Sequence, residues 1–244
     1  MTHTLLITRP ERQAARFAAL CEDRFGDRID IVTSPLIRIE ALSDPGSMAG
    51  YGGVIFTSEN AIAAVGPAAA GNAMRAYCVG DRTAEVARAA GYDAIAAEGD
   101  ADHLFDLILR QHVTPPLLHL RGEHARGALA ERLTQAGVKT DEAIVYRQIA
   151  QPLTEAARAV LRGDKPVILP LFSPRTASLF REGAAGCTAP LRIVVFSPAV
   201  ADALGGEFGD DIAVCQSPDV NEMLDMLARL IDAWWAVEDR GGAG

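Results

Sequence analysis

One local pattern recurs along the chain and limits what the chain can fold into. A short apolar run is followed by a turn rich in Ser, Thr, Gly, Pro or Arg, and then by a segment whose apolar residues repeat about every 3.6 positions. This unit of strand, turn and helix builds α/β folds, in which helices cover both faces of parallel sheets. We therefore expect an α/β protein. The units lie at 5–10, 53–60, 76–83, 117–123, 167–174, 193–198 and 212–218.

Further strands without the helical continuation are expected at 30–35, 93–96 and 143–146, which gives about ten strands in all. A single open sheet of that width is at the upper limit of what twisted sheets tolerate. We therefore expect two parallel sheets of about five strands, one in each of two three-layer α/β domains. Two extended segments, 35–42 and 146–152, contain proline and have the character of linkers.

The two extended segments predict that one domain is inserted into the other. If the chain leaves the first domain at the earlier segment and re-enters it at the later one, a discontinuous domain combines 1–36 with 152–244. The inserted α/β domain then spans 42–146. Segments 37–41 and 147–151 would lie side by side as a two-stranded linker.

Charge and hydropathy exclude several classes of function. The net charge of −9 argues against nucleic-acid binding, which depends on clustered positive charge. No apolar run approaches the roughly 20 residues of a membrane-spanning helix. Residues 1–10 lack the features of a leader peptide, so we expect a cytoplasmic protein with no membrane or nucleic-acid partner. The four cysteines are widely spaced without a CxxC pair, which predicts buried thiols.

Arginine dominates the basic residues, because Lys139 and Lys165 are the only lysines among 23 basic side chains. A guanidinium binds carboxylate or phosphate in bidentate geometry, so the excess of arginine is compatible with a small anionic ligand despite the acidic total. GC-rich coding explains the same excess equally well, and both interpretations stay open.

The turns that follow the strands predict where a ligand would bind. In open parallel sheets, ligands bind beyond the carboxyl ends of the strands, and Thr-Arg-Pro, Thr-Ser-Glu-Asn, Ser-Pro-Arg-Thr and Ser-Pro sequences all stand there. Each also begins a helix, whose unpaired N–H groups attract anions. Helix capping explains any one of them. Together they suit a ligand with many carboxylates, with charge supplied by Arg9, Arg121, Arg126 and Arg175.

A search for catalytic motifs is mostly negative, since GxGxxG, GxxxxGK[ST], GxSxG and HExxH are all absent. His119 and His124 lie close together without a third ligand, so we expect a solvated pair and no metal site. Ser173 is expected to cap a helix, because no histidine is placed beside it by the sequence. Tyr146 ends an expected strand, and its hydroxyl either points to the ligand edge or is satisfied within the core.

Several short motifs occur in a characteristic order and spacing: Leu-Ile-Thr-Arg-Pro at 6–10, Ile-Phe-Thr-Ser-Glu-Asn-Ala at 55–61 and Tyr-Cys-Val-Gly-Asp-Arg-Thr-Ala at 77–84. Leu-Arg-Gly at 120–122 with Arg126, Val-Tyr-Arg at 145–147, Phe-Ser-Pro at 172–174 and Phe-Ser-Pro-Ala-Val-Ala at 196–201 complete the set. Over nearly its whole length, the chain resembles the uroporphyrinogen-III synthase family.

The resemblance implies two α/β domains of inserted topology, joined by a two-stranded ladder, and a substrate bound between them. It implies a hydro-lyase of tetrapyrrole (haem) biosynthesis that cyclises hydroxymethylbilane, a polycarboxylate, to uroporphyrinogen III. Water is lost, and ring D is inverted through a spiro intermediate. The resemblance implies no cofactor. We also expect a monomer that receives its substrate by handover from hydroxymethylbilane synthase.

Matched position by position, Tyr146 corresponds to the tyrosine proposed to assist hydroxide departure, and Thr83 to the threonine of the Val-Gly-x-x-Thr-Ala element. Ser58 and Ser173 match hydroxyls of the ligand site. Some relatives have two threonines where this chain has Ala-Val at 199–200, so no side-chain hydroxyl acts there. The residues expected to bind substrate are Arg9, Thr57, Ser58, Thr83, Arg121, Arg126, Ser173, Arg175, Thr176 and Ser197.

Two other classes of function compete with this hypothesis. A non-catalytic, hinged two-domain binder of a small anionic ligand would have the same α/β halves and crossing linkers. A signalling protein of the response-regulator type would need acidic residues at the strand ends to bind Mg²⁺, whereas these ends carry Thr, Ser, Gly and Arg. The binder is therefore the stronger alternative.

Overall fold

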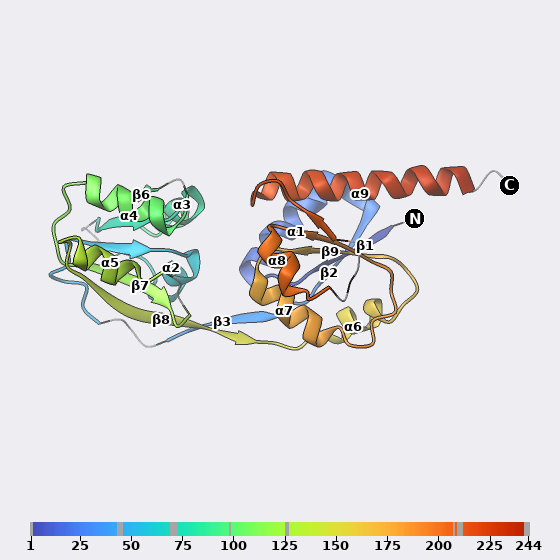
Figure 1. Cartoon of the computed structure of the whole chain (residues 1–244), viewed down its shortest axis with the longest axis horizontal. Coiled ribbons are helices and arrows are strands. Elements are labelled where there is room, and N and C mark those ends of the chain that lie inside the picture. Colours follow the sequence, from blue (N-terminus) through green and yellow to red (C-terminus); the bar gives the residue numbers. More distant parts are fainter. Residues whose placement is uncertain are drawn as a thin grey trace. The chain divides into compact units, whose positions relative to one another are not determined.

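The chain folds into two compact α/β units, each built on its own sheet (Figure 1). One unit comprises Met1–Arg38 with Ala150–Gly244, and the other comprises Ile39–Ile149. The computed structural model describes residues 2–42, 46–68, 73–97, 99–124, 127–206, 208 and 212–241, with side chains as far as residue 233. The α/β class and the two sets of mainly parallel strands expected from the sequence are confirmed.

The discontinuous unit contains a five-stranded sheet of order β11-β10-β9-β1-β2, in which the paired strands run parallel. Its strands are β1 (His3–Ile7), β2 (Ile29–Thr33), β9 (Val167–Leu171), β10 (Leu191–Val195) and β11 (Ile212–Val214). Its helices are α1 (Glu11–Phe25), the 3-10 helix η1 (Gly26–Arg28), α6 (Glu155–Leu161), α7 (Pro174–Gly183), α8 (Pro198–Ala203) and α9 (Val220–Gly241).

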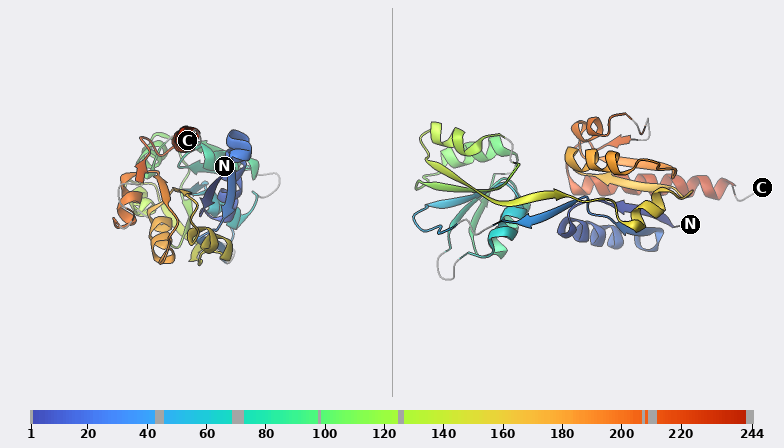
Figure 2. Two further views of the ribbon diagram at one scale, coloured as in Figure 1. Left: turned by 90° about the vertical axis from the view of Figure 1, so that its right-hand side faces the viewer. Right: turned by 90° about the horizontal axis from the view of Figure 1, so that it is seen from below.

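Alternation along β1, an interior strand, explains why helices lie on both faces of this sheet (Figures 1 and 2). Leu5 and Ile7 of β1 point to one face and pack with buried residues of α1 and α9. Leu6 points to the opposite face and packs with buried residues of α6, α7 and α8. Successive side chains of a strand point to opposite faces, so a strand that is buried on both sides is apolar at every position.

The second unit contains a six-stranded sheet of order β3-β8-β7-β4-β5-β6. Its strands are β3 (Ile37–Ala41), β4 (Gly53–Phe56), β5 (Arg75–Cys78), β6 (Asp93–Ala96), β7 (Leu117–Gly122) and β8 (Thr140–Ala150). Its helices are α2 (Glu59–Val65), α3 (Asp81–Ala89), α4 (Ala101–Arg110) and α5 (Leu129–Gln135). Helices α2 and α3 cover one face, and α4 and α5 cover the other.

This second sheet is one strand wider than the five expected, because β3 joins its edge beside β8. Leu42 N–H donates to the Val145 carbonyl over 2.8 Å, and Gln151 N–H donates to the Leu36 carbonyl over 2.9 Å. From Leu36 to Leu42 the residue numbers rise, while those of their partners fall from Gln151 to Val145, so the two segments run antiparallel. Segments 37–41 and 147–151 are the proposed linker strands, with the proposed domain limits at 36, 42, 146 and 152.

The sequence predicted four buried thiols, and three of the four cysteines are buried in the structure. Cys21, Cys78 and Cys215 are buried, whereas Cys187 is only half-buried. Burial raises the pKa of Cys21 and of Cys78 to about 12. Both groups are therefore neutral, unreactive parts of the core at physiological pH.

Candidate active site

In the second unit, the strand order gathers the expected site residues at one edge of the sheet. Strands β8, β7, β4 and β5 are consecutive neighbours, and the β7–β8, β4–β7 and β4–β5 pairs are parallel. Their carboxyl ends therefore lie along a single edge. Tyr146 lies on β8, Arg121 on β7, Thr57 and Ser58 follow β4, and Thr83 follows β5.

Tyr146 is positioned by an irregularity in β8. Leu120 pairs with Ala143 and Arg121 with Ile144, but Gly122 pairs with Tyr146, so β8 has one extra residue at this point. A bulge of this kind changes the face to which the following side chain points. Val145 and Tyr146, although consecutive, are consequently buried in the same cluster on the α2–α3 face.

The ring of Tyr146 lies directly over Gly122. A Cβ atom at Gly122 would stand 2.6 Å from Tyr146 Cζ and 2.9 Å from its hydroxyl oxygen, so a side chain there would force the ring to move. Tyr146 as a whole residue is 7% exposed. Among the residues that the structure describes, its hydroxyl has no hydrogen-bond partner and is not one of the buried, unpaired polar atoms. The sequence left open a hydroxyl satisfied within the core, and the described contacts do not show one.

Helices α2 and α3 begin beside this edge. The Ser58 side chain accepts a hydrogen bond from Asn60 N–H over 3.2 Å and so caps α2. Thr83 lies in the first turn of α3, which begins after Gly80, and its side chain is largely buried. An ion pair between Glu59 Oε2 and Arg82 Nε, 3.8 Å apart, links the two helix starts. The capping role of Ser58 leaves its own O–H available as a donor.

A series of polar side chains in contact with one another also reaches this edge. Its central residue, His119, was not recognised from the sequence. His119 was expected to be solvated beside His124, but this expectation is wrong, because His119 is 2% exposed. Its Nε2 lies 3.4 Å from Thr57 Oγ1, and its Nδ1 lies 3.3 Å from Glu142 Oε1. Arg121 Nη2 in turn lies 2.9 Å from Glu142 Oε2. The clue in the sequence was a histidine within the otherwise apolar β7 run, opposite a glutamate in β8.

Burial sets the protonation state of His119. Desolvation lowers its pKa below the ordinary value and outweighs the carboxylate of Glu142, which raises it, while Arg121 lowers it further. His119 is therefore neutral at physiological pH. A neutral imidazole has one donor nitrogen and one acceptor nitrogen, so His119 donates a hydrogen bond on one side and accepts one on the other.

This burial predicts a pH-dependent stability. Above about pH 6.5 histidine is neutral in both the unfolded and the folded chain. As pH falls below that value, the unfolded chain binds a proton that folded His119 does not, so the free energy of unfolding should decrease until the lowered folded pKa is reached. Urea unfolding at several pH values should show a shallower acid loss for His119→Gln than for the unchanged chain. The exposed His112→Gln variant serves as control, and an equal slope in all three proteins would contradict the assignment.

The discontinuous unit carries a second set of expected residues at its own carboxyl edge. Arg9 follows β1, and its guanidinium carbon lies 3.9 Å from the ring centre of Phe172, which follows β9. Phe172 packs edge-on against Phe17 and Phe196, with ring centres 4.9 Å and 4.5 Å away. This aromatic cluster fixes the position of the Arg9 guanidinium by a cation–π contact.

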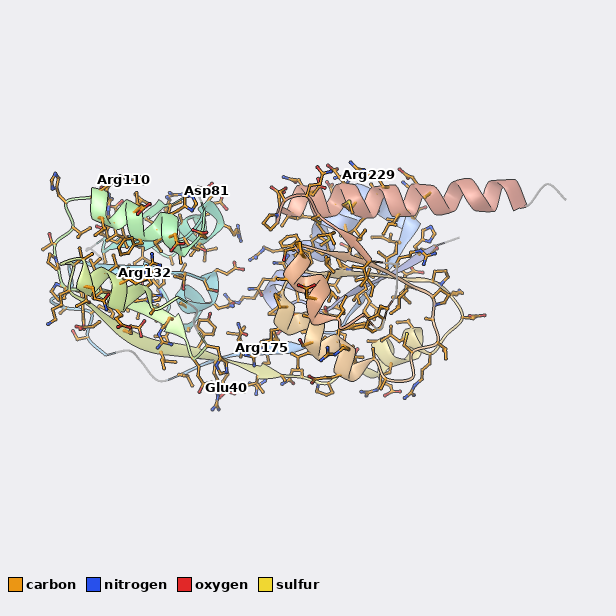
Figure 3. The ribbon with its side chains drawn as sticks, in the orientation of Figure 1. Glu40, Asp81, Arg110, Arg132, Arg175 and Arg229 are labelled. Carbon is orange, nitrogen blue, oxygen red and sulfur yellow. The ribbon has the colours of Figure 1, made fainter. Side chains whose placement is uncertain are left out.

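The start of α7 carries three of the expected residues. Ser173 caps the helix by accepting a hydrogen bond from Thr176 N–H over 3.2 Å, and the two hydroxyl oxygens are 2.9 Å apart. Arg175 lies in the same first turn (Figure 3). The capping role expected for Ser173 is therefore present. A helix start that carries two hydroxyls and an adjacent guanidinium is suited to binding an anion.

At the start of α8, Ser197 occupies the cap position without a side-chain capping hydrogen bond. Val200 is 1% exposed and belongs to the core, so its side chain does not reach the edge. Arg126 lies outside the described residues. Within the part of the chain that the structure describes, no group of three possible metal ligands is present, and no helix is long and apolar enough to cross a membrane.

Comparisons with known proteins agree on one family. The family model described as "Uroporphyrinogen-III synthase HemD" matches residues 15–225. The solved uroporphyrinogen-III synthetase of Helicobacter pylori is 16% identical, with a TM-score of 0.65 over 94% of this chain and 100% of that one. A mutant uroporphyrinogen III synthase of the extremely thermophilic bacterium Thermus thermophilus is 17% identical, with a TM-score of 0.53 over 96% and 100%.

At these identities the two solved structures show a shared fold, and a comparison with curated proteins gives no match. The family model decides the assignment because it spans most of the sequence, including β4, β5, β7 and β8 with their site residues. The chain belongs to the uroporphyrinogen-III synthase family.

Proposed function

We propose that the chain is a hydro-lyase of haem biosynthesis that converts hydroxymethylbilane to uroporphyrinogen III, with loss of one water molecule and inversion of ring D through a spiro intermediate. Family membership supports the reaction. The observation that carries the chemistry is the placement of Tyr146, whose hydroxyl stands over Gly122 at the carboxyl edge without a hydrogen-bond partner among the described residues.

Tyr146 is proposed to act as the general acid. The phenol would donate its proton to the terminal hydroxyl of hydroxymethylbilane while the bond between that oxygen and its methylene carbon breaks, so water leaves. Electrons of the pyrrole nitrogen form the new double bond to the methylene carbon, which gives a protonated, positively charged azafulvene. The phenolate recovers its proton when the last ring carbon to be joined loses its hydrogen. A phenol keeps its proton at neutral pH and is therefore suited to donate it.

The remaining site residues are proposed to hold the carboxylates and to orient the bilane. Helix starts at Ser58 and Ser173 offer N–H groups and hydroxyls, and Arg9 and Arg175 offer guanidinium groups. Positioning of this kind contributes to rate by holding reacting atoms in line. The full proposed set also includes Thr57, Thr83, Arg121, Arg126, Thr176 and Ser197.

Several further expectations from the sequence remain part of the proposal. They are action without a cofactor, a monomeric state, a cytoplasmic location, and receipt of the substrate from hydroxymethylbilane synthase. The family assignment supports the tetrapyrrole pathway, in which hydroxymethylbilane is the substrate of this activity.

The number of hydroxymethylbilane molecules consumed per protein molecule distinguishes an enzyme from a non-catalytic binder. Hydroxymethylbilane is supplied in large excess over the protein, and its disappearance is followed against the spontaneous rate. We expect many equivalents to disappear faster than in buffer. Acceleration that stops after one equivalent, or no acceleration at all by folded protein, would favour the alternative of a hinged binder.

A further inference from the structure

The side chains of Arg121, Glu142, His119 and Thr57 form a hydrogen-bonded series. Glu142 determines which atom donates and which accepts at each later contact in this series. Its Oε2 forms an ion pair with Arg121 Nη2 over 2.9 Å. An ionised carboxylate can only accept hydrogen bonds. The contact of 3.3 Å between Glu142 Oε1 and His119 Nδ1 therefore requires the proton to be on Nδ1.

The direction continues through His119. Its side chain is almost completely buried, and alternation along β7 puts it on the face of Leu117, which packs with Leu129 and Leu133 of α5. Glu142 and Arg121 are the charged groups that influence it. A neutral imidazole with its proton on Nδ1 has a bare Nε2, which accepts. Thr57 Oγ1, 3.4 Å from Nε2, must then donate its only proton to the ring.

We propose that His119 and Glu142 are positioning residues that make Thr57 a hydrogen-bond acceptor toward the ligand. This inference rests on the proposed function. With its proton committed to His119, the Thr57 oxygen has only lone pairs left for the substrate. It therefore recognises a donor, such as a pyrrole N–H, and rejects an ionised carboxylate.

The neighbouring residue provides the opposite preference. Ser58 Oγ accepts from Asn60 N–H over 3.2 Å, and its own O–H is free to donate to a carboxylate. An acceptor and a donor thus follow β4 at consecutive positions, Thr57 on the His119 face of the sheet and Ser58 at the start of α2 on the opposite face. A pyrrole N–H matches the acceptor and a carboxylate matches the donor, so the two hydroxyls favour different parts of the bilane.

The tautomer of His119 tests the inference without any substrate. The full chain is labelled with ¹⁵N-histidine, and the His119 signals are assigned by their loss in His119→Gln. At neutral pH we expect a neutral ring with its proton on Nδ1. A ring protonated on Nε2, or on both nitrogens, would overturn the inference, because Thr57 would then be free to donate.

Kinetics test the consequence for the ligand. Thr57→Val is expected to lower kcat/KM for hydroxymethylbilane about tenfold, the effect of one lost hydrogen bond in a partly buried site, and Thr57→Ser should stay within about threefold of the unchanged chain. Glu142→Gln should lose about as much as Thr57→Val, and the double variant should lose no more than either. Glu131→Gln, which removes an exposed charge from α5, is the control and should have no effect.

Circular dichroism confirms that each variant is folded. Folded Thr57→Val and Glu142→Gln variants with unchanged kcat/KM would overturn the inference while the proposed function stands. Losses that add in the double variant would also overturn it, since the two residues would then act independently. If the protein without substitutions shows no turnover, the proposed function is wrong. The tautomer measurement would still decide whether Thr57 donates its proton to His119.

Discussion

Tyr146→Phe is expected to lower kcat for uroporphyrinogen III formation by about 10²-fold, the contribution of a positioned general acid. The melting temperature should change little, because phenylalanine keeps the ring over Gly122 and the lost hydroxyl has no hydrogen-bond partner among the described residues. Steady-state rates at saturating hydroxymethylbilane, together with a thermal melt, measure both quantities.

Tyr92→Phe is the matched control for this substitution. Tyr92 is also buried in the second unit, but it precedes β6 at the opposite end of the strands, and its hydroxyl donates to the Gly66 carbonyl over 3.3 Å. Its loss should reduce stability by about 1 kcal/mol and leave kcat unchanged. An unchanged kcat in folded Tyr146→Phe would remove Tyr146 from the mechanism.

Gly122→Ala is expected to have the second large effect. The new Cβ would stand 2.6 Å from Tyr146 Cζ, so the ring must move away from the edge. We expect a loss of kcat similar to that of Tyr146→Phe, because the acid is displaced, and a cost in stability of about 1–3 kcal/mol from overpacking. Rates and urea unfolding of the same protein separate the two effects.

The cause of the Gly122→Ala effect can be isolated with two further variants. Gly183→Ala places a Cβ in ordinary contact, 3.4 Å from Leu153, and should be nearly neutral. The double variant Gly122→Ala/Tyr146→Ala removes the clash, so its loss of stability should be smaller than the sum of the single losses. Additive losses would show that Gly122 acts through something other than Tyr146.

Local pattern was sufficient to predict the parts of the fold that depend on local physics. Apolar runs followed by Ser, Thr, Gly or Pro predicted the strands and helix starts, because alternation, capping and turn geometry are set by neighbouring residues. Since the carboxyl ends of parallel strands share an edge, the same pattern placed Ser58, Thr83 and Ser173 at such edges.

What the sequence did not predict depends on pairing between distant strands. The register of β7 against β8 decides that His119 faces Glu142 and that Tyr146 faces Gly122, and no local pattern encodes that register. His119 therefore looked like half of a solvated pair with His124. The side-by-side placement of 37–41 and 147–151 was expected, but the inclusion of β3 in the second sheet was not, so the width of that sheet was underestimated.

The ring inversion is the central claim, and the isomer of the product tests it most directly. Hydroxymethylbilane is generated enzymatically in the presence of the full chain, the products are oxidised, and type I and type III uroporphyrins are separated by chromatography. Heat-denatured protein gives the spontaneous background. We predict rapid formation of the type III isomer. Type I alone, formed at the spontaneous rate in the presence of folded protein, would contradict the proposed reaction.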